Sequence, residues 1–285
     1  MYKKYIIIVI LLLIIAVAAF IAYQAQGVRR IYKAEAARRL ARTEKSDPGI
    51  LTENDIKYLP RPVQKYLIYT GVLGKEKVLN YRMVCEGAMK PDPQKDWAQI
   101  RTEQYSFTDN TGRLYFIQGN FSGLPAVGMD SYLDRKGSML IKLGGLIKVV
   151  DAAGPEMDQG ALVTLFNDMC LLAPATLIDG RIRWEELDGG TVKASFEDKG
   201  INISAVLYFN AEGQMTNFVT DDRYYSTTGK DYQKVRWSTP VKDYKDFNGI
   251  KLASSGEAIW HFPQGDYCYA KVNIKEVQYN CKDFK

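Results

Sequence analysis

The side chains that could support nucleophilic catalysis are few in this sequence. His261 is its only histidine, so any Ser–His–Asp or Cys–His arrangement would have to use that residue. His261 alternates with Trp260 and Phe262 in a run with the period of a β-strand, which is typical of a residue on a sheet face. We therefore expect His261 to be structural.

Four carboxylates offer another route to catalysis, hydrolysis by a pair of acids. They are Asp130, Asp134, Glu156 and Asp158. Glu156 and Asp158 are explained more simply as negative charges at the positive end of a helix. A carboxylate hydrolase is therefore the third of three functional hypotheses, and a non-enzymatic role is favoured over an enzymatic one.

The cysteines and the short motifs indicate no cofactor. Cys85, Cys170, Cys268 and Cys281 show no Cys-x-x-Cys spacing, which disfavours a zinc site or a thioredoxin-like redox pair. The sequence has no Gly-x-Gly-x-x-Gly motif, no Walker loop and no Gly-x-Ser-x-Gly elbow. We expect neither a cofactor nor a metal. Cys268 and Cys281 could pair in an exported domain, but their spacing alone does not decide this.

Aromatic side chains are the stronger functional signal. They make up 12% of the chain and are spread over many strand-like runs, and most of them are expected to fill an ordinary core. A strongly curved sheet with one inserted helix could also leave an apolar cavity for a lipid chain. The residues expected to bind such a ligand are Tyr115, Tyr132, Leu162, Phe166, Met169, Trp237 and Trp260.

The helix that would position several of these residues is predicted over 155–173. Pro155 suits the first turn of a helix, and Pro174 stops it. A helix among antiparallel strands must bury its apolar side against a sheet face. The residues of that apolar stripe are Leu162, Leu165, Phe166, Met169, Cys170 and Ala173.

From Val78 onward the apolar period changes to two, which predicts strands separated by turns such as Asn248-Gly249. The fold class is therefore α+β, with a strongly curved antiparallel sheet (a half-barrel) wrapped on the inserted helix. This domain is expected over 77–285, after a short helical segment at 49–76. The strands are expected near 78–89, 98–107, 113–119, 129–134, 138–150, 181–187, 191–196, 201–209, 215–221, 233–244, 250–262 and 267–279.

The run Tyr5–Tyr23 follows a short tail (1–4) and carries no charge. As a helix it would span about 28 Å, close to the thickness of a bilayer's hydrocarbon core. We expect an uncleaved, single-pass membrane anchor, and the alternative is a cleaved signal peptide. The basic residues after the span favour a cytoplasmic domain, whereas the short N-terminal tail favours export. We expect the domain to be extracytoplasmic.

Residues 24–48 are predicted to form a basic helical stalk. The segment is rich in alanine and arginine, and residues 28–45 contain no glycine or proline that would break a helix. It could contact anionic headgroups or be a solvated spacer, and a chain beginning at Thr52 is expected to be soluble. Because the net charge of +5 is modest and concentrated here, a nucleic-acid surface is not expected.

Several segments carry a resemblance to a known family. Leu59–Lys75 (LPRPVQKYLIYTGVLGK), Gly123–Asp134, Gly154–Ile178 and Trp237–Trp260 resemble a bacterial family of uncharacterised proteins (DUF6544/DUF6920-like), in which LPxPVQ(K/R)YL is the most specific signature. That resemblance brings no site residues with it. The order of strands and helix is also similar to lipoprotein carriers of the LolA/LolB type, a likeness at the level of the fold.

The sequence therefore favours a membrane-anchored, non-enzymatic domain that binds or handles a hydrophobic ligand, such as a lipid or a lipid-linked envelope component. The second hypothesis is a structural or interaction protein of the cell envelope whose core is filled. No protein partner is indicated.

Overall fold

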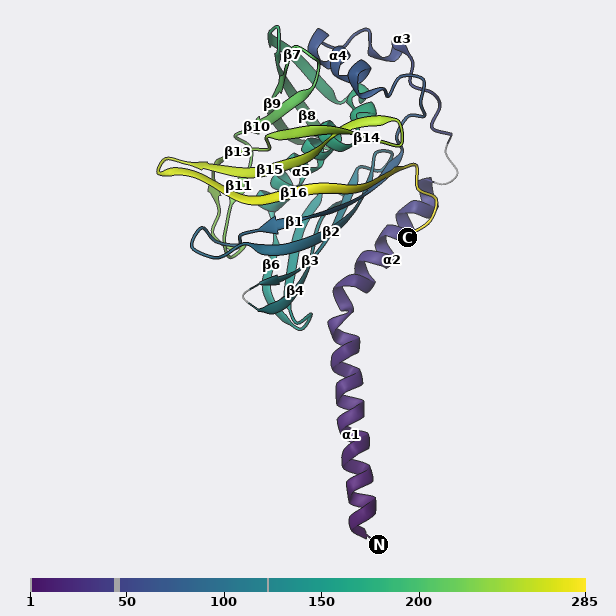
Figure 1. Cartoon of the computed structure of the whole chain (residues 1–285), viewed down its shortest axis with the longest axis vertical. Coiled ribbons are helices and arrows are strands. Elements are labelled where there is room, and N and C mark those ends of the chain that lie inside the picture. Colours follow the sequence, from purple (N-terminus) through teal and green to yellow (C-terminus); the bar gives the residue numbers. More distant parts are fainter. Residues whose placement is uncertain (1, 44–46, 122) are drawn as a thin grey trace.

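The computed structural model describes residues 2–43, 47–121 and 123–285. The fold is α+β, with a large antiparallel sheet and an apolar N-terminal helix that projects away from the strands (Figure 1). The helices are α1 (Tyr2–Ala25), α2 (Gly27–Thr43), α3 (Glu53–Ile56), α4 (Arg61–Thr70) and α5 (Pro155–Leu172), and α5 is followed by a 3₁₀ turn, η1 (Pro174–Ile178).

Within the described residues, fourteen strands form one sheet. One half contains, in spatial order, β6 (Ile147–Ala153), β5 (Lys136–Leu143), β4 (Leu124–Leu133), β3 (Gly112–Phe121), β2 (Ala98–Phe107) and β1 (Asn80–Met89). The other half contains β16 (Gly265–Tyr279), β15 (Ile250–Phe262), β13 (Arg236–Ser238), β10 (Met215–Thr220), β9 (Ile201–Phe209), β8 (Thr191–Asp198) and β7 (Ile182–Asp188). β14 (Val241–Phe247) also pairs with β15, and β11 (Tyr224–Tyr225) pairs with β12 (Gln233–Lys234).

Two predicted strands are each divided in the structure. The run 138–150 becomes β5 and β6 because Gly144 and Gly145 adopt positive φ angles of 58° and 71° and turn the chain. The run 233–244 becomes β12, β13 and β14. Its last break lies at Pro240, which has no N–H group to offer a ladder.

Helix α5 lies against both halves of the sheet, contacting β4, β5 and β6 on one side and β9 and β15 on the other. The predicted apolar stripe is buried, which confirms its role in the core. Phe166 is fully buried, stacks on Phe196 of β8 with ring centroids 5.2 Å apart, and meets Phe218 of β10 edge-on at 5.8 Å. The space around the middle of α5 is therefore filled by side chains.

Helix α2 packs on the face of β2 and β3 that points away from α5. Neither alternative considered for the stalk predicted a contact with the sheet. Val28, Tyr32, Ala36 and Leu40 form a second buried cluster with side chains of those strands: Tyr105, Phe107, Leu114 and Phe116. Arg39 is also buried and donates to Asp134 at 3.1 Å. The arginines on the other side of α2 remain exposed. The last part of the predicted stalk, 44–46, lies outside the described residues.

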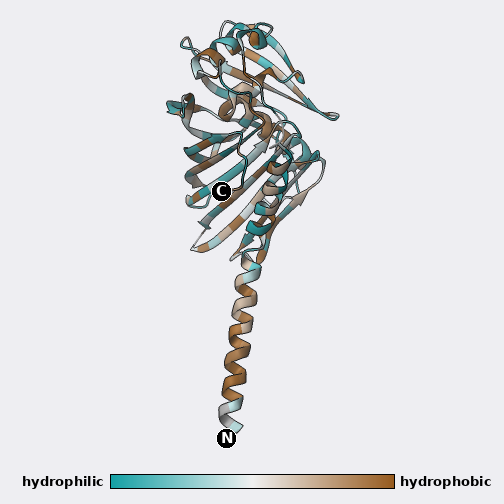
Figure 2. Cartoon of the chain, turned by 90° about the vertical axis from the view of Figure 1, so that its right-hand side faces the viewer, coloured by the Kyte–Doolittle hydropathy of each residue, from teal (hydrophilic) through white to brown (hydrophobic). Residues whose placement is uncertain are grey.

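Helix α1 is strongly apolar over Tyr5–Ala25, and this apolar stretch is not buried against the rest of the protein. Figure 2 shows this helix as a continuous hydrophobic rod below the strands. By length and composition it is either a signal sequence or a single membrane anchor.

Candidate functional site

The C-terminal end of α5 is fixed by hydroxyl groups from other elements. The last carbonyls of a helix have no partner within it, so a buried helix end needs outside donors. The Tyr66 hydroxyl of α4 donates to the carbonyl of Cys170 at 2.9 Å, and the Tyr279 hydroxyl of β16 donates to the carbonyl of Leu172. Burial raises the pKa of both tyrosines well above the usual range, so both hydroxyls keep the proton they donate.

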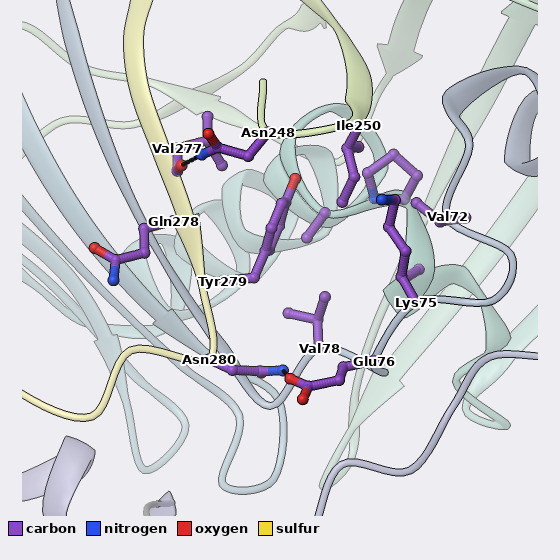
Figure 3. Close-up of a pocket in the computed structure, with 13 residues that line it drawn as sticks. Val72, Lys75, Glu76, Val78, Asn248, Ile250, Val277, Gln278, Tyr279 and Asn280 are labelled. Atoms are coloured by element: carbon purple, nitrogen blue, oxygen red, sulfur yellow. Dashed lines mark hydrogen bonds between the residues drawn. The ribbon is translucent and has the colours of Figure 1, made fainter. Parts of the chain in front are cut away.

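A cavity of about 410 Å³ opens beside this helix end (Figure 3). Its walls come from the α4–β1 connection, the α5–η1 junction, the β14–β15 turn and the end of β16. The apolar lining residues are Val72, Val78, Ala173, Pro174, Ala175, Ile250 and Val277, and the polar ones are Lys75, Glu76, Asn248, Gln278, Tyr279 and Asn280.

The polar residues around this cavity differ in how they are paired. Asn280 donates to Glu76 at 2.9 Å, and Asn248 donates to the carbonyl of Val277 at 3.3 Å. Lys75 is half-buried and forms no ion pair with any residue that the structure describes. Figure 3 shows Lys75 and Tyr279 on opposite sides of the space, with Val78 between them. The cavity therefore combines apolar walls with one ammonium group, that of Lys75, and one carboxylate, that of Glu76, neither of which forms an ion pair within the described chain.

The β14–β15 turn brings its backbone close to that charge. Asn248 and Gly249 both have positive φ angles, 57° and 81°, as a tight hairpin turn requires, which confirms the predicted turn. A Cβ atom at position 249 would lie 2.9 Å from the Lys75 ammonium nitrogen. Glycine at this position thus leaves room for the lysine beside the cavity.

A second cavity of about 410 Å³ lies at the other end of α5 and has a different character. Most of its lining residues are charged or polar. Lys136 donates to Asp158 at 3.0 Å, and the backbone N–H of Gly137 donates to the same carboxylate at 2.7 Å, whereas Arg135 forms no ion pair within the described chain. Asp158 therefore joins α5 to β5 besides lying at the helix N-terminus. Its apolar side chains, Pro155 and Ile201, are fewer than those of the first cavity.

The seven residues predicted to bind a ligand lie elsewhere. Leu162, Phe166 and Met169 are packed in the core under α5. Tyr132 donates to Asp198 at 2.8 Å, and the Arg113 guanidinium lies 4.7 Å from the Tyr115 ring. The predicted Trp237 and Trp260 flank Arg223, whose guanidinium lies 4.2 Å and 5.3 Å from their rings. All seven belong to the described part of the chain, and none lines either cavity.

The candidate acids do not form a catalytic pair. Arg113 binds Asp130 at 2.8 Å on one face of the sheet, Arg39 binds Asp134 from the α2 side, and Lys136 holds Asp158. Sequence reasoning missed Asp168, which accepts from Arg113 at 2.7 Å. Burial raises the pKa of the Asp168 carboxyl above its usual value, and the guanidinium opposes that rise.

His261 lies between two partners that spacing could not reveal, because they come from neighbouring strands. Its Nε2 is 2.8 Å from the Ser238 Oγ, and its Nδ1 is 2.7 Å from an oxygen of Asp266. These are the atoms of a Ser–His–Asp triad. However, Ser238 is only 2% exposed, whereas the Asp266 side chain is 63% exposed. A nucleophile must reach its substrate, so this arrangement is a hydrogen-bonded network on a sheet face.

All four cysteines are free thiols. The Cys268–Cys281 pair considered above does not form because Cys268 lies within β16 and Cys281 just beyond its end, about 40 Å apart along an extended strand. Among the described residues, no group of three His, Cys, Asp or Glu side chains could hold a metal ion.

Comparisons with known proteins agree with the resemblance noted in the sequence. The chain is similar in fold to a LolA superfamily protein from Nitrosomonas europaea (TM-score 0.43, 9% identity, covering 76% of this chain and 93% of that one). It is also similar to an outer membrane lipoprotein-sorting protein domain from Vibrio parahaemolyticus (TM-score 0.38, 11% identity, 70% and 85%) and to a DUF1329 family protein from Desulfovibrio piger (TM-score 0.43, 11% identity, 76% and 91%).

No functionally curated protein matches the sequence. The profile of a family of unknown function, DUF6544, matches residues 49–272, which include every segment on which the resemblance was based. The chain therefore belongs to the DUF6544 family.

Proposed function

We propose that this protein is a membrane-anchored, non-enzymatic domain that holds the nonpolar part of an anionic amphipathic ligand, such as a lipid, in the cavity at the C-terminal end of α5. One observation carries the proposal: apolar side chains line a space of about 410 Å³ that opens beside Lys75, which has no ion pair within the described chain, while the Glu76 carboxylate in the same lining accepts from Asn280. Small-molecule sites commonly combine an apolar lining with a few polar groups that orient the ligand.

The apolar lining residues would supply the contact surface for a chain-like ligand. Val72, Val78 and Ile250 are each at most 7% exposed, yet they border the cavity. A ligand that fills the space would remove the remaining apolar surface from water. Lys75 would then pair with a carboxylate or phosphate head at the opening. An ammonium group in a partly desolvated place gains more from an anion than it would in bulk water.

The contacts of α5 support a curved sheet around this helix. A flat sheet of this width could not bring both β5, near one edge, and β9, near the other, against the same helix. We infer that 77–285 forms a half-barrel around α5, with the helical segment 49–76 packed over η1 through α4. The cavity then lies where the inserted helix ends and side chains no longer fill the interior.

The contacts of α1 support an uncleaved anchor. The Arg30 guanidinium lies 3.6 Å from the centre of the Tyr23 ring, so the end of the apolar helix interacts with the start of α2. Because α2 packs on the sheet, the anchor would be joined to the domain without a flexible linker.

We place the domain on the extracytoplasmic side. Protease added to cells that have been stripped to their inner membrane should digest the domain. Protection of the domain until that membrane is permeabilised would contradict an extracytoplasmic location.

A fluorescent fatty acid tests the proposed ligand site. The full chain in lipid nanodiscs should bind the probe saturably. Ile250→Trp should weaken binding by filling the cavity, and Lys75→Gln should weaken it by removing the charge. Lys57→Gln is the matched control, since Lys57 is exposed on the surface near α3 and outside the cavity. Equal binding by all four proteins would contradict the proposed site.

The filled core favours a second candidate function, a structural or interaction protein of the cell envelope. The observation behind it is the close packing of Phe166 against Phe196 and Phe218. If this second function holds, the cavity at the helix end has no physiological ligand, and no lipid should remain bound through purification.

A further inference from the structure

Two hairpin tips carry exposed apolar side chains close together. Leu124 lies on the β3–β4 hairpin and is 55% exposed; Leu146, Ile147 and Val149 lie on the β5–β6 hairpin and are 43%, 68% and 46% exposed. Single exposed apolar residues are common on protein surfaces, but a contiguous group usually marks a contact surface. We call these four residues the apolar rim.

The two tips form one unit. The backbone N–H of Gly144 in the β5–β6 turn donates to the carbonyl of Pro125 in β4 at 2.7 Å. The turn itself is closed by a bond from the Leu146 N–H to the Leu143 carbonyl at 3.0 Å. Leu124 precedes Pro125 directly, so its side chain is held near those of the second hairpin.

The rim lies at the end of the apolar helix. Gly145, in the middle of the β5–β6 turn, approaches the backbone of Ala25 so closely that a Cβ atom on Gly145 would overlap the Ala25 carbonyl. Ala25 is the last residue of α1. Figure 1 shows the lower ends of β3, β4 and β6 beside the break between α1 and α2. If α1 spans a bilayer, these tips are at the level of the membrane surface.

The charges around the rim suit the same position. Arg29 and Arg30 are exposed at the start of α2, and Lys148, which pairs with Asp151 at 2.7 Å, is exposed between Ile147 and Val149. Arg30 also lies over the ring of Tyr23. Aromatic and basic residues beside apolar ones are typical of the membrane interface, where the basic groups meet anionic headgroups.

We propose that the apolar rim inserts into the interface of the leaflet from which α1 emerges, so that the domain rests on the lipid surface in a fixed orientation. This inference rests on the proposed function in one respect, the assignment of α1 as an uncleaved anchor. It adds a second membrane contact, made by the β domain itself. The occupant of the rim is the bilayer because the end of α1 touches the turn that carries the rim.

An environment-sensitive fluorophore tests the proposal in the full chain, reconstituted into vesicles of phosphatidylcholine and phosphatidylglycerol. Cys268→Ser removes the partly exposed native thiol, and the other three cysteines are buried. The fluorophore is then attached at Ile147→Cys, at Leu12→Cys within α1, or at Leu187→Cys. Leu187 is 50% exposed and follows Glu186, which lies beside α4 at the opposite end of the domain.

We expect the Leu12 and Ile147 probes to be quenched several-fold more strongly by lipid-attached quenchers than the Leu187 probe. If the Leu12 probe is quenched but the Ile147 probe is quenched no more than the Leu187 probe, the proposed insertion of the apolar rim is wrong and the assignment of α1 as an anchor still stands. A Leu12 probe that is not quenched would overturn the anchor, and this inference with it.

Two adjacent glycines provide a matched control for variants that disturb the turn. Gly144 and Gly145 both have positive φ angles, so Gly144→Ala and Gly145→Ala bring similar backbone strain. Only a Cβ atom at position 145 meets Ala25; one at 144 has nothing within 4 Å. Gly145→Ala should lower quenching of the Ile147 probe, and Gly144→Ala should leave it unchanged. Equal effects of the two variants would contradict the contact with α1 on which the proposal depends.

Discussion

Arg113 of β3 donates to Asp168 of α5 at 2.7 Å, and this ion pair joins the inserted helix to the sheet inside the protein. Arg113 also binds Asp130 of β4 at 2.8 Å, and Gln104 of β2 donates to Asp168 at 3.0 Å. Four buried polar atoms on β1, β2 and β4 lack a hydrogen-bond partner among the described residues: the hydroxyls of Tyr81 and Thr102, Oε1 of Gln104 and Oδ1 of Asp130. We expect ordered water to satisfy them.

Loss of Arg113 should destabilise the protein strongly. Arg113→Met leaves Asp168 and Asp130 as buried carboxylates without a counter-charge, so the free energy of unfolding should fall by about 3–5 kcal/mol. The double variant Arg113→Met/Asp168→Leu should recover part of that loss, because it also removes one uncompensated charge. Urea unfolding of the three proteins measures both effects. A change below about 1 kcal/mol for Arg113→Met would mean that the ion pair is not buried as described.

The pH dependence of stability should include a contribution from Asp55 at the start of α3. The ammonium of Lys77 and the Thr52 hydroxyl and N–H lower the pKa of the Asp55 carboxyl to about 2. Because the folded pKa lies below the unfolded value of about 3.9, this contribution is present above pH 4 and is lost as the pH falls towards 2. Carboxyl NMR titration gives the pKa directly. Asp55→Asn should flatten the stability profile in this window, and an identical profile would contradict the assignment.

Removal of α2 should expose apolar surface on the outside of the sheet. A chain that begins at Gly27 keeps the cover over Tyr105, Leu114 and Phe116, whereas a chain that begins at Thr52 loses it. We now expect the shorter chain to self-associate and to bind a hydrophobic dye, because exposed patches of this kind promote association. Size-exclusion chromatography of the two chains decides the matter. A monomeric, dye-free chain from Thr52 would show that the α2 contact is dispensable.

Phe166→Ala should separate packing from ligand binding. Phe166 is fully buried between Phe196 and Phe218, so the variant should lower the free energy of unfolding by about 3–5 kcal/mol. Phe166 does not line the cavity beside Lys75, so the folded variant should still bind the fatty-acid probe. A cost of only about 1–2 kcal/mol would indicate free space beside Phe166. If the folded variant no longer binds the probe, the ligand site lies at the middle of α5, as the sequence predicted.

The sequence was sufficient for the elements whose signals are local. The period of 3.6 predicted α5, and the alternation in 201–209 predicted β9 with its bounds. The prediction of one strand over 138–150 was wrong because Gly144 and Gly145 have successive positive φ angles, which divide a run whose apolar pattern is continuous. The predicted strand over 233–244 is likewise divided, and its last break lies at Pro240.

The candidate site could not be predicted because it is assembled from distant segments. Ala173, Val78 and Ile250 have no distinctive spacing, and only the sheet order brings β1, β16 and the β14–β15 turn to the end of α5. The same reason explains why Ser238, His261 and Asp266 were not recognised as neighbours. The packing of α2 was missed because alternating basic residues concealed the buried face made by Val28, Tyr32, Ala36 and Leu40.

Native mass spectrometry of the purified full chain tests the central claim most directly. The proposed function predicts an added mass in the range of a fatty acid or phospholipid on the wild-type protein and on Lys57→Gln, and its loss from Ile250→Trp, whose larger side chain occupies the cavity. A wild-type spectrum without bound lipid, or an Ile250→Trp variant that retains the same added mass, would contradict it.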